Sequence, residues 1–240
     1  MASSLDACHD YWSNGKDLLF ISSTYEPKFM KCWVPILMTY SNGATAEHYR
    51  IHFLKLMRGI LRSAIQSNRP FTDSMVANVV DHCEAQSKGF KEAFMDLRTL
   101  HAADGRTPAQ LLQAATSLLK GCKQHFATQV ERLSKVSGVV APDRKSEFKK
   151  LTYSLLKADT MDSLNITVAE LKRDFPHAKA WVEWWMRPAH AVMLFECVRA
   201  VCIQSSGNHC RRPQMRRRQC ITGYIEWSAV IYRSTKEFQA

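Results

Sequence analysis

The spacing of apolar residues changes along this chain, and that change constrains its fold more than any other feature. Short, β-prone apolar runs lie before residue 81, whereas helical spacing prevails from there to about residue 195. No periodicity survives in residues 207–240. With 240 residues and 46% apolar composition, the chain can bury a core as one or two domains. The pattern predicts an α/β fold, with its strands early and its helices late.

Two early segments read as strands that each lead into a helix. Residues 33–40 are apolar and close on the turn signal of residues 41–43, which predicts a buried strand. A helix with one apolar and one basic face is expected from about Thr45. Residues 74–80 form the second predicted strand, which ends on Asp81 before a helix over residues 84–97.

The second half of the chain carries start and stop signals of helices. Thr107 and Pro108 predict a helix start, and Gln110 completes a capping box. Apolar spacing then favours one long helix as far as Val136, and a linker follows at residues 138–142. Further helices are expected over residues 148–155, 161–175 and 180–187. The chain therefore divides into residues 1–136, a helical unit at 137–200 and a basic tail at 201–240.

Charge and cysteine usage limit the partners and the compartment. The net charge is +11, and residues 207–240, with seven Lys or Arg against two acids, contribute +5 of it. Such a balance suits a partner rich in phosphates, above all DNA. An acidic N-terminus and the charges within the apolar stretch 189–203 argue against a secretion signal and a membrane span. Eight cysteines without a CxxC pair predict reduced thiols in an intracellular protein.

Three groups of residues could carry chemistry. Asp81 could hold Mg²⁺ as one of several converging carboxylates, or it could cap the following helix together with Glu84, which is the more common role. Cys122 and His125 have the spacing of two zinc ligands, although a core cysteine and a helix-face histidine explain them more simply. The Trp-rich residues 180–187 could stack nucleobases, but their spacing favours core packing. Residues 202–220 also hold Cys and His, at a spacing that fits no known zinc finger.

Several blocks resemble the Mutator-like (MULE) transposases carried by fungal mobile elements. The similarity runs from about Trp33 to about Arg199, through WVPILMTYSNGATAEHYRIHF, VVDHCEAQSKGFKEAF, LLKGCKQHF, SGVVAPD and RDFPHAKAWVEWWMRPAHAVMLF. The resemblance implies a partial ribonuclease-H-like mixed sheet flanked by helices, with a mostly helical insertion. It also implies an Asp-Asp-Glu triad that cleaves and joins DNA with Mg²⁺.

The resemblance assigns some positions and leaves one acid unplaced. Asp81 matches the second acid of the triad, at the end of its strand. Cys122 and His125 match the family's C-x-x-H, which implies a short strand over residues 117–121 within the predicted long helix. The first aspartate belongs to a strand upstream of Trp33. There the nearest counterpart, residues 21–25, has Ser22 where the acid should be.

The third acid is expected after the Trp-rich block, in a pattern like T-T-N-A-A-E-A-M-H, where this chain reads RRPQMRRRQCIT. Codons CAA ATG CGG CGG AGG CAA TGC ATC ACT would encode residues 214–222. Read from the last base of the Gln214 codon, they give N-A-A-E-A-M-H-H, with the glutamate codon split between Arg217 and Arg218. The tail is therefore interpreted as an out-of-frame translation, which predicts poor order.

The resulting hypothesis is a nuclear transposase remnant without cleavage activity, in which Asp81 is the recognisable acid and Mg²⁺ binding is impaired. Two alternatives stay open. One is an active divalent-metal nuclease that recruits further acids, such as Asp17 and Glu196. The other is a non-enzymatic protein that binds DNA through phosphates. The basic residues expected at DNA are Arg50, Lys55, Arg58, Arg62, Arg211, Arg212, Arg216, Arg217 and Arg218.

Overall fold

A five-stranded mixed sheet organises the first half of the protein. The computed structural model describes residues 3–9, 11–12, 17–100 and 104–205. The strands are β1 (Ser3–Cys8), β2 (Leu18–Glu26), β3 (Cys32–Ser41), β4 (Asn78–Val80) and β5 (Leu119–Gly121). Their spatial order is β3-β2-β1-β4-β5. The β3–β2 and β2–β1 pairs are antiparallel, and the β1–β4 and β4–β5 pairs are parallel. The predicted class, a mixed sheet flanked by helices, is confirmed.

Helices supply most of the remaining described structure. The α-helices are α1 (Ala46–Gln66), α2 (Glu84–Leu100), α3 (Pro108–Leu118), α4 (Lys123–Leu133), α5 (Lys145–Leu155), α6 (Met161–Asp174), α7 (Lys179–Trp185), α8 (Pro188–Leu194) and α9 (Glu196–Ser205). Short 3-10 turns are η1 (Asp73–Val76), η2 (Pro142–Arg144) and η3 (Pro176–Ala178). No helix in the described part of the chain is long and apolar enough to cross a membrane.

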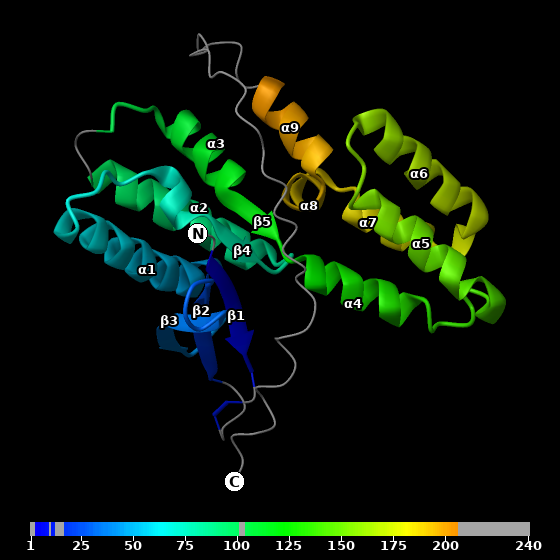
Figure 1. The fold of residues 1–240 in the computed structure, drawn as a ribbon, viewed down its shortest axis with the longest axis horizontal. Coiled ribbons are helices and arrows are strands. Elements are labelled where there is room, and N and C mark those ends of the chain that lie inside the picture. Colours follow the sequence, from blue (N-terminus) through cyan, green and yellow to red (C-terminus); the bar gives the residue numbers. More distant parts are fainter. Residues whose placement is uncertain (1–2, 10, 13–16, 101–103, 206–240) are drawn as a thin grey trace.

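The first hydrophobic core lies between the sheet and α1 and α2, which run side by side (Figure 1). The apolar face predicted for α1 is the one that is buried, with Phe53 and Met57 against Phe90 and Phe94 of α2. The two helices approach closely at Gly89, where a Cβ atom would come within 2.5 Å of the Ala46 carbonyl oxygen. Close packing here fixes α2, and therefore the segment that joins it to β4.

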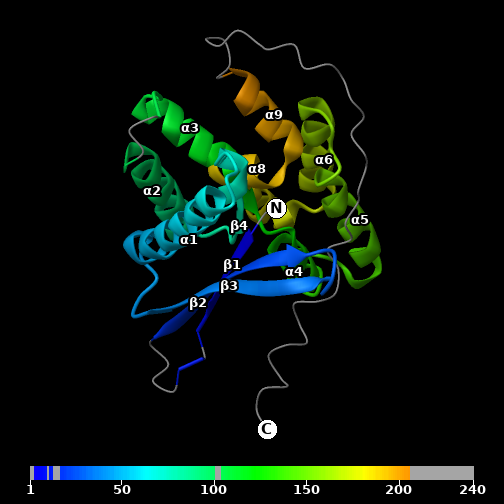
Figure 2. The same ribbon diagram turned by 60° about the vertical axis from the view of Figure 1, so that its left-hand side comes forward.

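A second core is built from helices α4 to α9, which lie on the other side of the molecule from α1 and α2 (Figures 1 and 2). Phe126 and Val130 of α4 are fully buried in it together with Phe148, Leu171 and Trp185. Along the chain, buried residues therefore pass from the first core to the second between β5 and α4. The boundary expected at residue 136 lies inside the second unit, because the apolar face of α4 packs against α5 and α7 rather than against the sheet.

Both strands predicted from the sequence exist, with corrections. Residues 33–40 lie in β3, but β3 is an edge strand, and Ile36, Met38 and Tyr40 are exposed rather than buried. The second strand has only three residues, because the first half of the predicted segment forms the 3-10 turn η1. The strand that contains Trp33 shares a sheet with the strand before Asp81, as expected, yet it is not its neighbour, since β2 and β1 lie between them.

The long helix expected from Thr107 to Val136 is wrong. The capping box at its start is present, with Gln110 N–H donating to the Thr107 hydroxyl and Gln110 Oε1 accepting from Thr107 N–H. The helix stops at Leu118, however, because the next three residues pair with β4 as β5. The short strand that the family resemblance implied is therefore present. Pairing with a buried strand overrides the helical periodicity of the local sequence.

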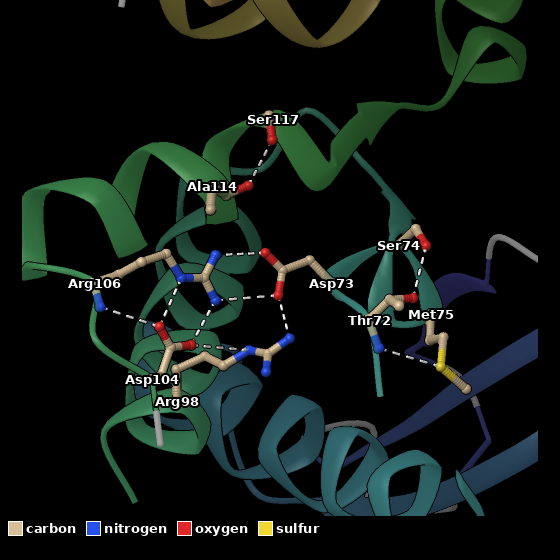
Figure 3. A network of polar contacts seen from close by, with 9 residues as sticks. All are labelled: Thr72, Asp73, Ser74, Met75, Arg98, Asp104, Arg106, Ala114 and Ser117. Atoms are coloured by element: carbon tan, nitrogen blue, oxygen red, sulfur yellow. Dashed lines mark hydrogen bonds and ion pairs between the residues drawn. The ribbon is translucent and has the colours of Figure 1, made fainter. Parts of the chain in front are cut away.

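A network of ion pairs holds the start of α3 against η1 (Figure 3). The guanidinium of Arg106 lies between the carboxylates of Asp73 and Asp104, at 2.6 Å from each. Arg98 of α2 also pairs with Asp73 and lies over the ring of Phe71 at 4.6 Å. Since η1 precedes β4 and α3 precedes β5, the network joins the segments that lead into these two strands.

Candidate metal centre

Three polar side chains follow one another across the ends of the parallel strands. In the β1–β4 ladder Ser4 pairs with Val79, and in the β4–β5 ladder Val80 pairs with Gly121. The β4–β5 register leads directly to Asp81 and Cys122, which lie close together. Asp6 lies on β1, two positions beyond the last residue that pairs with β4. The carboxyl ends of parallel strands are the usual place for a ligand site in an open α/β sheet. The fold thus assembles a row of two carboxylates and a thiol at this edge.

These polar side chains lie on the face of the sheet opposite the first core, because side chains alternate between the two faces along a strand. Leu5 and Val80 are buried against α1 and α2. Because successive side chains of a strand point to opposite faces, the residue after each of them faces the other side of the sheet. Asp6 is exposed there, and the side chain of Asp81 is 28% exposed. Both carboxylates are therefore reachable from solvent.

The start of α4 brings a histidine to the same place. Cys122 N–H donates to the Val80 carbonyl oxygen at 3.0 Å, which prolongs the strand pairing by one residue. The Cys122 carbonyl then accepts from Phe126 N–H, the first hydrogen bond of the helix. Residues three apart on a helix share a face. His125 therefore projects beside Cys122, and the C-x-x-H spacing is that of one helical turn at a strand end.

His125 and Asp81 form an ion pair in this arrangement. The distance between His125 Nδ1 and Asp81 Oδ1 is 2.9 Å. Hydrogen bonds to Asp81 and then to Cys122 raise the pKa of His125 to about 10, so the imidazole is protonated at neutral pH. One ligand atom from each of Asp81, Cys122 and His125 lies within 4.8 Å of the other two. These three residues, here called the Asp-Cys-His group, have the donor atoms and the spacing to share one metal ion.

Asp81 does not cap the helix that follows it, contrary to the simpler interpretation of the D-x-x-E sequence. The first hydrogen bond of α2 runs from Ser87 N–H to the Cys83 carbonyl oxygen at 3.1 Å. Two residues separate Asp81 from this helix start at Glu84, and its backbone N–H donates to Gln86 Oε1 at 2.9 Å. The Asp81 carboxylate therefore does not cap α2 and instead pairs with His125.

Asp6 was missed by sequence reasoning, which searched residues 21–25 for a first acid. Asp6 is on β1, the parallel neighbour of the strand that precedes Asp81. The only signal in the sequence is a short alternation in SSLDAC, which is too brief to predict a strand without knowledge of its partner.

The residues examined in place of a first or third acid lie elsewhere. Ser22 is on β2, fully buried, and its hydroxyl is 2.8 Å from His52 Nε2. Asp17 is hydrogen-bonded to Tyr40 and raises the pKa of that phenol. Glu196, at the start of α9, has a side chain that is 78% exposed and lies 4.0 Å from Lys123 Nζ. None of these three belongs to the Asp-Cys-His group.

A pocket of about 370 Å³ opens beside the Asp-Cys-His group. Three elements line it: the segment after β4 with Asp81, His82 and Cys83, helix α4 with His125 and Gln129, and helix α7 with Trp181, Trp184 and Trp185. Trp185 is 2% exposed, which fits the expected core packing. The buried indole N–H groups of Trp181 and Trp185 have no hydrogen-bond partner among the described residues. The aromatic residues thus pack in the second core and also form the apolar wall of the pocket.

The predicted basic face of α1 is present in part. Lys55, Arg58 and Arg62 are exposed. Arg50 is engaged within the protein instead, because its guanidinium pairs with Glu47 and with Asp96 of α2, each at 2.7 Å. The remaining arginines expected at DNA, between residues 211 and 218, lie outside the described residues, as does the tail whose order was in question.

Comparisons of the chain with protein-family models, with curated proteins and with solved structures give no match.

Proposed function

We propose that this protein is the remnant of a Mutator-like transposase core, one that binds DNA through phosphates and does not cleave it. The observation that carries the proposal is the strand order β3-β2-β1-β4-β5, in which Asp81 directly follows β4 and Asp6 lies on its parallel neighbour β1. In enzymes that cut phosphodiesters, converging carboxylates hold metal ions that stabilise the attacking and leaving oxygens. A mixed sheet with an acid directly after a central strand supports the ribonuclease-H-like assignment.

The inactivity follows from counting ligands for Mg²⁺. This ion prefers oxygen ligands in near-octahedral geometry and keeps several waters. Two carboxylates, Asp6 and Asp81, could supply ligands to at most one such ion together with its waters, and they are too few for a pair of ions. The position aligned with the third acid is occupied by Arg217 and Arg218 in the sequence. Arginine there would repel a metal ion, although it could still bind a phosphate.

The proposal is tested by incubating the purified protein with duplex DNA in Mg²⁺ and in Mn²⁺, with the Asp81→Ala variant as the matched control. We expect no cleavage of DNA ends above the level of the variant. Reproducible cleavage that disappears in Asp81→Ala would mean that the acid set is complete. That result would support the active-nuclease alternative, with Glu196 as the first further acid to replace because it lies beside Lys123, next to Cys122.

The non-enzymatic alternative is favoured by the exposed cations on α1. A protein that binds DNA only through phosphates has an affinity that falls steeply with salt. It is also insensitive to chelators. Under the main proposal binding is likewise phosphate-dominated, so the two differ in ancestry rather than in present activity. Either activity would be exercised on DNA in the nucleus.

A further inference from the structure

We infer that the Asp-Cys-His group is a site for a thiophilic transition-metal ion such as Zn²⁺, bound by one oxygen of Asp81, Cys122 Sγ and His125 Nδ1. This inference does not rest on the proposed function. It concerns the ligand chemistry of these three residues, whatever the protein does with DNA.

The donor set decides which metal fits. A thiolate, an imidazole nitrogen and a carboxylate oxygen match Zn²⁺ or Co²⁺ and not Mg²⁺, which selects oxygen ligands. Tetrahedral zinc with bonds of 2.0–2.3 Å requires ligand atoms roughly 3.3–3.8 Å apart. The three ligand atoms already lie within 4.8 Å of one another. Metal binding therefore requires these atoms to come closer by at most about 1.5 Å.

The backbone that carries these ligands is rigid. Asp81 and Cys122 follow directly on paired positions of β4 and β5, and the Cys122 N–H is itself hydrogen-bonded to Val80. His125 is held by the first turn of α4, whose Phe126 is fully buried. Preorganised ligands lose little conformational freedom on binding a metal. Metal binding requires deprotonated ligands, so entry of the ion would be accompanied by release of protons.

Three protein ligands leave the fourth tetrahedral position open, which is the pattern of zinc sites that exchange a water or a substrate atom. Asp81 and His125 both line the pocket walled by Trp181, Trp184 and Trp185. A pocket of about 370 Å³ therefore lies beside the inferred site. The inferred site and a Mg²⁺ site at Asp6 and Asp81 would compete for Asp81.

Cobalt provides the test, because Co²⁺ bound to a thiolate gives a charge-transfer band in the near ultraviolet and tetrahedral Co²⁺ gives intense visible bands. We expect the full-length reduced protein to bind one Co²⁺ with both signals and to release it when Zn²⁺, but not a large excess of Mg²⁺, is added. Cys122→Ser should abolish the charge-transfer band. The exposed His125→Gln, which is the variant least able to disturb folding, should weaken Zn²⁺ binding by about tenfold or more.

Two control variants distinguish cobalt binding at Cys122 from cobalt binding at other cysteines. Cys83→Ser changes a cysteine that lines the pocket but lies outside the group. Cys210→Ser changes one in the tail, outside the described residues. Both should keep the cobalt spectrum. A spectrum that survives in Cys122→Ser, one that is lost in Cys210→Ser, or the absence of any cobalt binding would overturn the inference. Cleavage assays do not enter this test, so its failure is distinguishable from failure of the proposed function.

Discussion

At the scale of single residues, His52 is a buried histidine that the fold keeps neutral. It lies on α1 at 1% exposure, with Nε2 2.8 Å from the Ser22 hydroxyl of β2 and Nδ1 2.7 Å from the Thr39 hydroxyl of β3. Burial lowers the pKa of His52 to about 4 from an ordinary value of 6.5. The unfolded chain therefore binds a proton at mildly acidic pH that the folded chain does not.

The sign of the pH effect follows from this difference. The stability linked to a neutral His52 is fully present above pH 6.5 and is lost as the pH falls from there toward 4. At one pKa unit per 1.36 kcal/mol, the loss reaches at most about 3 kcal/mol. We expect urea unfolding at pH 7 and pH 5 to show a larger drop for the wild type than for His52→Gln. His82, whose pKa burial also lowers to about 4, is unchanged in both proteins. Equal drops would contradict the assignment.

At the scale of elements, two helical glycines give a matched test of how α1 and α2 pack. A Cβ at Gly89 of α2 would lie 2.5 Å from the Ala46 carbonyl oxygen and 2.7 Å from Tyr49 Cβ, whereas a Cβ at Gly59 of α1 would meet nothing within 4 Å. Gly89→Ala should therefore destabilise the protein by roughly 1–3 kcal/mol, because the helices must separate. Gly59→Ala should stabilise it by up to about 1 kcal/mol through helix propensity.

The denaturant midpoints of Gly89→Ala and Gly59→Ala, compared with that of the wild type, measure these two changes in stability. Because both changes add one methyl group to a helix, the difference between them isolates the helix contact from propensity. Stabilisation in both variants would mean that α1 and α2 do not approach closely at Gly89.

The elements that the sequence predicted are those whose signals are local. The apolar stripe of α1, the capping box of α3 and the stop at Pro176 after α6 each depend on residues within a few turns. The short strands are different. β5 has three residues and continues a helical pattern, so only its pairing with β4 makes it a strand. Local propensity cannot predict such a strand without its partner, and only the family resemblance indicated it.

At the scale of the whole molecule, the proposed DNA binding can be assigned to particular surfaces by removing exposed cations from one surface at a time. Each phosphate contact made by a cation contributes about 0.9 to the slope of log affinity against log salt concentration. Replacing the exposed Lys55, Arg58 and Arg62 by Ala should therefore reduce that slope by up to about 3. A variant that removes three exposed cations from the second unit, Arg132, Lys135 and Lys150, is the control of equal charge.

Fluorescence anisotropy of a labelled duplex over a salt series gives both slopes. The α1 variant should lose more of the slope than the control if α1 faces DNA. Identical slopes for the two variants would assign the salt dependence to net charge alone and remove α1 from the interface.

Assembly of the candidate site was only partly predictable for the same reason as the short strands. Cys122 and His125 are close in sequence, and their partnership could be proposed from spacing. Asp6 and Asp81 are seventy-five positions apart and meet because β1 and β4 pair in parallel, as Ser4 does with Val79. That register is a property of the tertiary fold. Asp81 was identified from its place at the end of a strand, whereas Asp6 required the sheet.

The register of β1, β4 and β5 also determines how different kinds of mutation would affect the site. A substitution at Asp6, Asp81 or Cys122 removes one donor and leaves the others in position. Deletion of a single residue within β4 acts differently, since side chains alternate with a period of two. It would turn the Asp81 carboxylate into the core beside Phe90 and bring Val80 to the surface. A point mutation thus removes one donor, whereas a one-residue deletion in the three-residue strand β4 would take Asp81 out of the site and also place a charge in the core.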